Sequence, residues 1–314
     1  MKLLVTGSAG LVGTPLVSRL RMLGHEVIEV DVRSAAADAL DFRDERCEQL
    51  LASGANGVIH LAAVSRVAWG ETDPELCQAI NVDGTEQLLS RQQRMAPGAW
   101  FLFASSREVY GDPASELVRE SDPLRPVNHY GRSKLEGERA VTRARQTGLI
   151  TATARLCSVY GGREDHPDRV VPALLWRALQ GEPLVLTGGD AYFDFVHVDD
   201  VVSGILRIVE MLATGERELP TIHLATGWKT SLRQLARLVV QAAGSTSAID
   251  EVVARNFDVS GFCGEPELAA QVLGWHARTT LEHGLSTLVA DMRSNGALAQ
   301  FSFSDFARIV TARG

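Results

Sequence analysis

Tyr130 and Lys134, which are four residues apart, are the side chains of this sequence best suited to chemistry. In a helix this spacing puts the two side chains one turn apart on the same face. An ammonium beside a phenol favours the phenolate, so we expect Lys134 to lower the pKa of Tyr130 from its ordinary value of about 10. The pair therefore predicts a general base that works near neutral pH.

A glycine-rich turn at residues 7–13 predicts a dinucleotide site. The turn lies between an expected strand at 3–5 and an expected helix at 11–23. Glycines in this context allow a tight turn and close approach of a pyrophosphate, while the helix amino terminus offers N–H groups and a positive dipole end. We expect the cofactor to contact these residues of the turn: Gly7, Gly10, Leu11, Val12 and Gly13.

An acidic residue at the end of the second expected strand indicates which dinucleotide is bound. Asp31 follows the strand at 27–30, in the position where a carboxylate accepts hydrogen bonds from the adenosine ribose. A carboxylate there favours NAD over NADP, because it would repel a ribose phosphate. Arg33 is close in the sequence and could soften that preference. The sequence therefore predicts NAD.

Short apolar runs alternate with helical patterns in the first half of the chain. The expected strands are 3–5, 27–30, 58–61, 100–103 and 151–156, and the expected helices between them include 82–94 and 130–147. This alternation predicts βαβ units and a doubly wound parallel (Rossmann) sheet, hence an α/β fold.

The pattern changes after residue 162, which predicts a second, smaller domain. In this part we expect a helix at 170–180, a strand at 183–186 and a segment at 196–202 that returns to the first domain. The predicted division is a dinucleotide-binding domain at 1–165 with a return segment at about 190–225, and a mixed α/β substrate-binding domain at 166–189 and 226–314. The final aromatic side chains, Phe301, Phe303 and Phe306, predict either docking of the tail on the body or a partner, or a loosely packed terminus.

Composition restricts the class of partner. The chain of 314 residues has a formal net charge of −8, which argues against nucleic acid or an anionic membrane as the main partner. The four cysteines are scattered without a C-x-x-C pair, so we expect reduced thiols and no metal site. Residues 1–6 lead directly into the glycine turn, and no apolar run is long enough to span a bilayer. A cytoplasmic location is therefore expected.

A succession of further motifs extends over nearly the whole chain, to about residue 293. These motifs are Asp41-Phe42, His60-Leu61-Ala62-Ala63, Asn81 to Thr85, Ser105 to Gly111, Arg155 to Gly161, Asp194 to Asp200, and Leu273-Gly274-Trp275. Together with the glycine turn and the Tyr-Lys pair, they resemble the extended short-chain dehydrogenases/reductases of the NAD-dependent sugar-nucleotide epimerase/dehydratase group. The resemblance implies these additional cofactor contacts: Asp41, Phe42, Leu61, Ala62, Ala63, Asn81, Ser105, Tyr130, Lys134 and Cys157.

The resemblance also implies a reaction. Ser106 would hydrogen-bond the sugar oxygen that is oxidised, Tyr130 would take its proton, and Lys134 would hold the nicotinamide ribose. Hydride transfer to NAD would give a 4-keto sugar, and return of the hydride to the other face would give the 4-epimer. The expected substrate is a nucleotide sugar. A homodimer, paired through the helices at 82–94 and 130–147, is also implied.

Two positions depart from the family pattern in the expected substrate site. Ser158 stands where the family usually has Asn, and Phe193 stands where it has an Arg that pairs with the diphosphate. Loss of that Arg removes a charge-assisted contact, although Arg255 resembles the second diphosphate-binding Arg of the family. The resemblance implies these substrate contacts: Ser65, Ser106, Ser158, Arg169, Val170, Phe193 and Arg255.

Glu108 leaves the outcome of the reaction open. In the 4,6-dehydratases and uronate decarboxylases of the group, a carboxylate occupies this position, and in the dehydratases it removes a proton beside the transient ketone. However, the acid that usually precedes it in the glucose-type dehydratases is Arg107 here, which favours a 4-epimerase. Glu108 could instead simply pair with Arg107 or Arg132.

Two other functions remain as alternatives. The changes at Ser158 and Phe193 are compatible with a ketoreductase or sugar dehydrogenase that uses exchangeable NAD(P)H. A non-catalytic NAD-binding protein is the alternative from another class, and the intact set of Ser106, Tyr130 and Lys134 argues against it.

Overall fold

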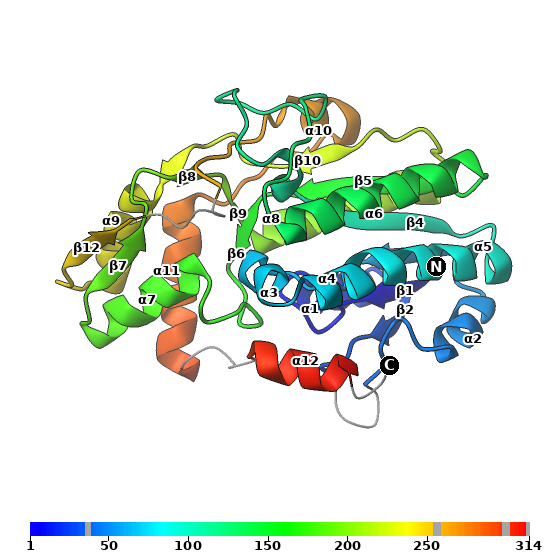
Figure 1. Cartoon of the computed structure of the whole chain (residues 1–314), viewed down its shortest axis with the longest axis horizontal. Helices are drawn as coiled ribbons and strands as arrows, with labels where there is room; N and C mark the ends of the chain where they lie inside the picture. Colours follow the sequence, from blue (N-terminus) through cyan, green and yellow to red (C-terminus); the bar gives the residue numbers. More distant parts are fainter. Residues whose placement is uncertain (35–38, 254–258, 297–301, 312–314) are drawn as a thin grey trace.

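A sheet of six parallel strands is the centre of the computed structural model, which describes residues 1–34, 39–253, 259–296 and 302–311 (Figure 1). Its order is β10-β5-β4-β3-β1-β2. The strands are β1 (Lys2–Thr6), β2 (Glu26–Val30), β3 (Gly57–His60), β4 (Trp100–Ser106), β5 (Thr151–Leu156) and β10 (Ile222–Leu224). The doubly wound parallel sheet predicted from the sequence is confirmed, with the first five strands at the expected positions.

Alternate side chains of each strand enter two different cores, because successive residues of a strand point to opposite faces. In β1, Leu3 and Val5 join one core and Leu4 joins the other. The first core also holds α1 (Gly13–Met22), α8 (Val198–Ala213) and α10 (Glu267–Leu273). The second core holds α2 (Arg46–Ala52), α5 (Gly84–Met95) and α6 (His129–Gln146). The sheet is therefore buried on both faces, as a parallel sheet requires.

The chain changes direction across the sheet at β1. Strand β2 pairs with one side of β1, and β3 pairs with its other side. In open α/β sheets, ligands bind outside the carboxyl ends of the strands at such a switch point. The amino terminus of α1 lies at this end of β1, so the topology alone places a binding crevice there.

Short connecting helices lie on the edge of this crevice. They are α3 (Val67–Thr72), α4 (Pro74–Gln78), a π-helical turn (Ala79–Asp83) and a 3-10 turn (Arg107–Tyr110). The 3-10 turn follows β4 directly, so the residues after Ser106 bend away from the sheet and beside the crevice.

A third core is built from the second half of the chain. It packs α7 (Val170–Gln180), α9 (Leu232–Ala243) and α11 (Leu281–Asn295) against short strands. These strands form three pairs: β6 (Ser158–Tyr160) with β9 (Phe195–His197), β7 (Leu184–Thr187) with β12 (Ile249–Val252), and β8 (Tyr192–Phe193) with β11 (Thr230–Ser231). The expected helix at 170–180 and strand at 183–186 are present, while the predicted domain boundaries stay predictions.

The segment expected at 196–202 packs in the first core, where Val196, Val198 and Val201 lie together with Leu3 and Val5 of β1, although it adds no strand to the central sheet. Strand β9 pairs with β6 outside the central sheet, and α8 begins at Val198, where the His197 side chain accepts a hydrogen bond from the Asp199 N–H. The segment that rejoins the sheet is β10, which pairs with β5. A strand of three residues is too short to show the alternation by which strands are recognised in a sequence.

A buried ion pair holds α6 against the end of β5. Arg155 donates to both carboxylate oxygens of Glu138, at 2.8 and 2.7 Å, and Glu138 also accepts a hydrogen bond from Ser105. Both charged side chains are buried. A buried pair of this kind is expensive to break, because removing one partner leaves an uncompensated charge. The pair therefore fixes α6 relative to β4 and β5.

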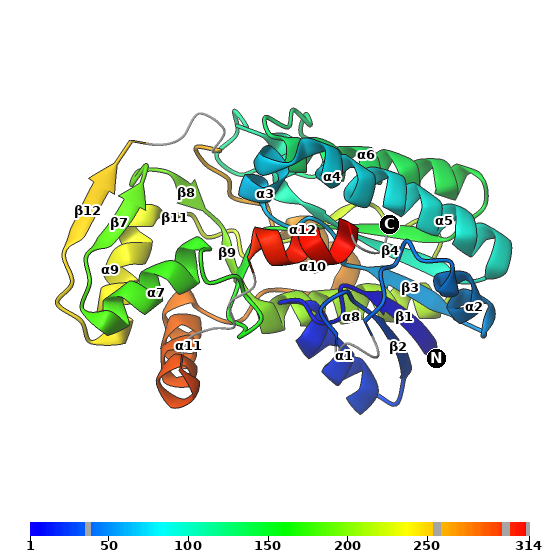
Figure 2. The same ribbon diagram turned by 60° about the horizontal axis from the view of Figure 1, so that its bottom comes forward.

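The carboxyl-terminal helix α12 (Phe303–Thr311) docks on the first half of the chain, and it crosses the side of the molecule that faces the viewer in Figure 2. Phe306 is buried and stacks on Trp69 with ring centroids 5.3 Å apart, and Val310 belongs to the same core. The prediction that the tail docks on the body is confirmed for these residues. Phe301 and the side chain of Phe303 lie outside the described part of the chain.

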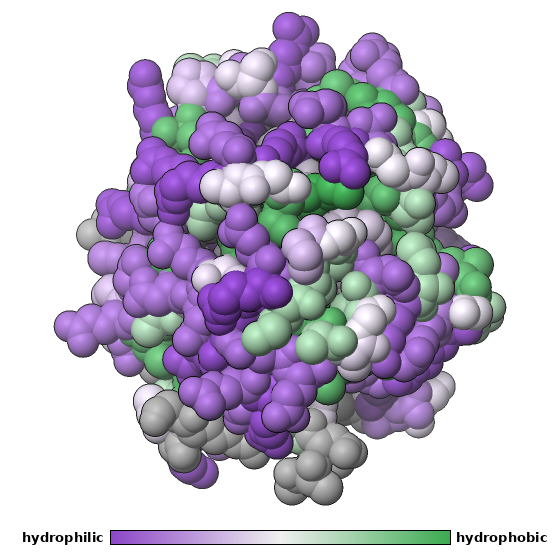
Figure 3. Space-filling view, turned by 90° about the vertical axis from the view of Figure 1, so that its right-hand side faces the viewer, coloured by the Kyte–Doolittle hydropathy of each residue, from purple (hydrophilic) through white to green (hydrophobic). Residues whose placement is uncertain are grey.

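The surface on the opposite side from the short strands is mainly hydrophilic, with scattered apolar patches (Figure 3). On the part of the chain that the structure describes, no helix is both long enough and apolar enough to cross a membrane. The exposed surfaces of α5 and α6 carry ion pairs such as Arg143–Glu86 and Arg139–Glu136. The homodimer expected through these two helices stays a prediction.

Candidate active site

A large cavity of about 1240 Å³ lies at the carboxyl ends of the central strands and extends to the short strands of the second half. It is lined by nearly all of the residues predicted for the site. These are Gly7, Gly10, Leu11, Val12, Gly13, Asp31, Arg33, Asp41, Phe42, Leu61, Ala62, Ala63, Ser65, Ser105, Ser106, Glu108, Tyr130, Lys134, Cys157, Ser158, Arg169, Val170 and Phe193. Arg255 lies outside the described residues. The roles assigned to these residues stay predictions.

The glycines of the turn let the chain pack closely on itself and on the residues that follow β3. Gly7 has φ +73°, and a Cβ atom there would lie 2.7 Å from the Ala62 nitrogen. A Cβ atom on Gly13 would collide with the Gly7 carbonyl oxygen. At the start of α1, Val12 occupies the capping position and no side chain makes a capping hydrogen bond. Among the described residues, no hydrogen-bond partner is found for the N–H groups of Leu11, Val12 and Gly13, which line the cavity, and these groups fit a pyrophosphate.

Asp31 is fixed at the end of β2 by backbone groups. Its carboxylate accepts hydrogen bonds from the Ala9 N–H at 2.9 Å and from the Arg33 N–H at 2.7 Å. The Arg33 side chain is 3.6 Å from the same carboxylate and also lines the cavity. Asp31 therefore reaches across to the glycine turn, where it can receive the hydroxyl groups of a ribose.

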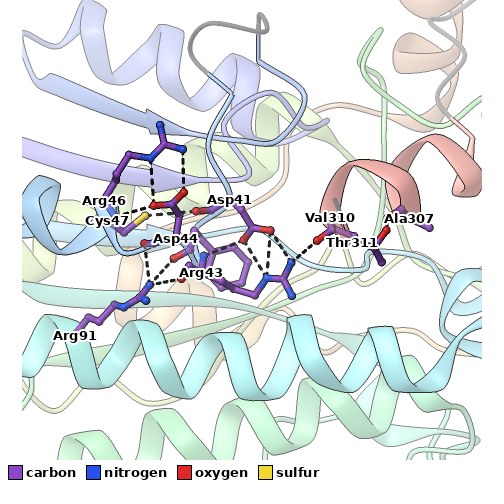
Figure 4. A network of polar contacts seen from close by, with 10 residues as sticks. Asp41, Arg43, Asp44, Arg46, Cys47, Arg91, Ala307, Val310 and Thr311 are labelled. Atoms are coloured by element: carbon purple, nitrogen blue, oxygen red, sulfur yellow. Dashed lines mark hydrogen bonds and ion pairs between the residues drawn. The ribbon is translucent and has the colours of Figure 1, made fainter. Parts of the chain in front are cut away.

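Asp41 is held by an arginine that also contacts α12 (Figure 4). Arg43 donates from Nε and Nη2 to the Asp41 carboxylate, at 3.1 and 2.7 Å, and from Nη2 to the Val310 carbonyl at 3.1 Å. Beside them, Phe306 and Val310 form part of the cavity wall. The carboxyl-terminal helix is therefore part of the site, on the side of Asp41.

Ser106, Tyr130 and Lys134 meet at the end of β4. Asn128 caps α6, because its side chain accepts a hydrogen bond from the Gly131 N–H at 2.7 Å. This cap fixes the first turn of the helix, which carries Tyr130. Lys134 follows one turn later and its Nζ donates to the Ala104 carbonyl at 2.8 Å. Tyr130 is hydrogen-bonded to Ser106.

The expected lowering of the Tyr130 pKa is wrong for the side chains of this protein alone. Burial raises the pKa of Tyr130 to about 12, and the hydrogen bond from Ser106 only partly offsets this. Lys134 Nζ lies 6.0 Å from the Tyr130 ring centroid. Burial also lowers the pKa of Lys134 to about 8. Desolvation therefore outweighs the attraction between ammonium and phenolate that helical spacing predicts.

Glu108 has a partner on each oxygen. Arg107 Nη2 lies 2.8 Å from Oε1, and the Asn128 side chain donates to Oε2 at 2.8 Å. The possibility that Glu108 pairs with Arg107 is thus confirmed. A carboxylate held by two donors is less available to remove a proton from a substrate carbon.

Two of the predicted cofactor contacts have other partners in the protein, and a third is a buried thiol. Asn81 does not line the cavity, because its side chain bonds the Val64 backbone at 2.7 and 3.1 Å and Ser133 at 2.9 Å. Asn81 is therefore a brace between segments of the chain, and the prediction that it contacts the cofactor is wrong for this arrangement. The Ser105 hydroxyl is turned to Glu138. Cys157 lines the cavity, and burial raises the pKa of its thiol well above the usual value, which makes it an inert wall residue.

Sequence reasoning missed part of the wall. Trp69, Phe306 and Val310 line the cavity together. Phe306 and Val310 are four apart in a helix with one apolar face, a spacing that could have predicted their docking. Nothing in the sequence indicates that they dock beside Asp41. Within the described ranges, no cluster of His, Cys, Asp or Glu could hold a metal ion.

Comparison with known proteins gives consistent matches over most of the chain. Residues 3–220 match the model of the NAD dependent epimerase/dehydratase family. The chain is 30% identical to UDP-glucose 4-epimerase of Mycolicibacterium smegmatis, over 94% of this chain and 99% of that protein. It is 28% identical to dTDP-glucose 4,6-dehydratase of Streptomyces griseus, over 92% of this chain and 93% of that protein. The structure of MoeE5 in complex with UDP-glucuronic acid and NAD is similar with a TM-score of 0.84 and 30% identity, over 94% of this chain and 99% of that one.

The buried ammonium of Lys134 predicts a stability that depends on pH. Since its pKa falls from 10.5 to about 8 on folding, the unfolded chain binds more protons at this site between these two values. Below pH 8 the ammonium therefore destabilises the folded state. The free energy of unfolding of Lys134→Met, measured relative to wild type, should therefore be higher at pH 7 than at pH 10 by about 2 kcal/mol.

Urea unfolding of both proteins at the two pH values measures this difference. Thr142→Ala, an exposed change on α6 whose hydroxyl bonds only the Glu138 carbonyl, is the control, and its difference from wild type should be the same at both pH values. A Lys134→Met difference that does not change between pH 7 and pH 10 would contradict the account.

Proposed function

This chain belongs to the NAD-dependent epimerase/dehydratase family, and we propose that it is a nucleotide-sugar 4-epimerase that uses bound NAD. The observation that carries the proposal is the meeting of Ser106, Tyr130 and Lys134 in the same cavity as the glycine turn. The relatives named above act on nucleotide sugars, and MoeE5 was seen with NAD and a nucleotide sugar. A nucleoside diphosphate hexose is therefore the substrate class to test first.

Bound NAD would supply the hydride acceptor and then return the hydride to the sugar. Asp31 and the amino terminus of α1 would hold its ribose and pyrophosphate, and Lys134 would hold the second ribose. The unbonded N–H groups of Leu11, Val12 and Gly13 at the start of α1 fit this group.

The side chains of this protein have separate tasks in the reaction. Ser106 orients the sugar hydroxyl by a hydrogen bond, and Tyr130 takes its proton in the oxidation and gives it back in the reduction. The high pKa of Tyr130 keeps the phenol protonated at neutral pH, so the proton that the second task needs is in place. Lys134 supplies positive charge that favours the phenolate in the first task.

The contacts of Glu108 favour epimerisation over elimination. A dehydratase needs a base that reaches a carbon beside the ketone, whereas both oxygens of Glu108 are held, by Arg107 and Asn128. The presence of a carboxylate here and the 28% identity to a dehydratase keep a 4,6-dehydratase or decarboxylase as the second candidate.

We expect Tyr130→Phe to lower kcat by at least about 100-fold, because it removes the group that moves the hydroxyl proton. The assay is interconversion of UDP-glucose and UDP-galactose without added cofactor. Ser286→Ala, an exposed change on α11 outside the cavity, is the control and should keep the activity. Equal activity of Tyr130→Phe and wild type would contradict the assigned role, and a requirement for added NADH would favour net reduction instead.

Because α12 forms part of the cavity wall, we expect it to strengthen the binding of NAD. Phe306→Ala removes the ring that stacks on Trp69, so the dissociation constant of NAD should rise about 3- to 10-fold. The control is Arg308→Ala, an exposed residue of the same helix whose side chain is absent from the cavity wall. Calorimetric titration of cofactor-stripped protein measures the constant, and an unchanged value for Phe306→Ala would show that α12 does not retain the cofactor.

A further inference from the structure

Arg107 is a nearly buried cation in the wall of the cavity, directly after Ser106. Its side chain is 15% exposed, and its guanidinium carbon lies 4.4 Å from the centroid of the Phe193 ring. Phe193 and Arg107 both line the cavity. One flat face of the guanidinium is thus covered by an aromatic ring, a common arrangement for arginine in recognition sites.

The hydrogen bonds of this guanidinium are incomplete. Nη2 is paired with the Glu108 carboxylate at 2.8 Å, while Nη1 is buried and has no hydrogen-bond partner among the described residues. Buried polar groups in folded proteins are almost always paired, and an exception calls for a reason. The ring of Phe193 and the carboxylate of Glu108 fix the guanidinium plane. Because the protein covers Nη1, a ligand oxygen reaches this nitrogen only after a rotation of the side chain.

The position of this cation agrees with the departure noted in the sequence. Phe193 stands where the family pattern has an arginine, which removes a positive charge from that strand. Because Arg107 stacks on Phe193, the charge is supplied at the same place from a different element, the 3-10 turn after β4. The two departures from the family pattern, Arg107 and Phe193, are therefore in contact with each other and form one feature of the cavity wall.

We propose that Arg107 is a substrate-specificity residue whose guanidinium binds an anionic oxygen of the nucleotide sugar beside Ser106. This inference rests on the proposed function. The anion is either an oxygen of the diphosphate or a carboxylate on the sugar, and both accept charge-assisted hydrogen bonds from a guanidinium. The contact with Glu108 holds the guanidinium in place, so Glu108 is a positioning residue in this account.

The test uses NAD-loaded wild type, Arg107→Gln and Arg107→Lys. Gln retains a donor for Glu108 but has no charge, and Lys retains the charge but not the flat fork. Arg139→Met, an exposed change on α6 outside the cavity, is the control. Each protein is titrated calorimetrically with UDP, UDP-glucose and UDP-glucuronate, after its NAD content and melting temperature have been compared with those of wild type.

We expect Arg107→Gln to bind the anion about 10- to 100-fold more weakly, with a smaller loss for Arg107→Lys and none for Arg139→Met. If the anion is the diphosphate, all three ligands weaken. If it is a sugar carboxylate, only UDP-glucuronate weakens. Equal dissociation constants for wild type and Arg107→Gln with every ligand would overturn the proposal. If Arg107→Gln does not fold, the dissociation constants of Arg107→Lys are compared with those of wild type instead, and equal values would again overturn it.

Inorganic pyrophosphate and glucuronate separate this proposal from the proposed function. Each is tested for a rise in melting temperature at millimolar concentration. If wild type binds no nucleotide sugar but is stabilised by one of these anions, and Arg107→Gln is not, the proposed function fails and the anion site stands. If wild type responds to none of the ligands, both fail.

Discussion

A buried ammonium is the constraint on which the rest of this site depends. Lys134 lies in the second turn of α6 with its charge removed from water, and its one hydrogen bond in the structure goes to the Ala104 carbonyl at the end of β4. Burying a charge is costly, as its lowered pKa shows. The neighbouring features hold this arrangement in place: the Asn128 cap fixes the start of α6, and the pair of Glu138 and Arg155 fixes the helix to β5. The fold thus accepts a loss of stability in order to keep the Lys134 ammonium in the cavity near Tyr130.

The same cavity joins this chemistry to cofactor binding. The glycine turn enters it from one side of the switch point, and Ser106 and Tyr130 enter it from the strands and helix on the other. The short strands of the second half bring Phe193 to the same cavity, and α12 closes the side near Asp41. Each of these elements is far from the others in sequence, so the active site exists only when all three cores have formed.

Much of the fold followed from the sequence, because strands and helices alternate strictly in the first half and each strand has a continuous apolar run. Strand β10 could not be predicted, since its three residues carry no periodic signal. Among the site residues, the glycine turn and the line from Ser106 to Lys134 were predicted by spacing and resemblance. The rise in the pKa of Tyr130 could not be predicted from the sequence, because it depends on burial rather than on the spacing of two residues along a helix. Likewise, the contact between Arg107 and Phe193 joins residues distant in the sequence, and only the folded chain shows it.

The fate of the sugar hydrogens tests the central claim most directly. Wild-type protein, with no added cofactor, is incubated in D₂O with UDP-glucose, UDP-glucuronate or dTDP-glucose, and the products are examined by NMR. A 4-epimerase that returns the abstracted hydride gives the 4-epimer with no deuterium on any sugar carbon. Deuterium beside C4, together with loss of water or of carbon dioxide, would contradict the account and show that the protein is a dehydratase or a decarboxylase. No product from any of the three sugars would also contradict it.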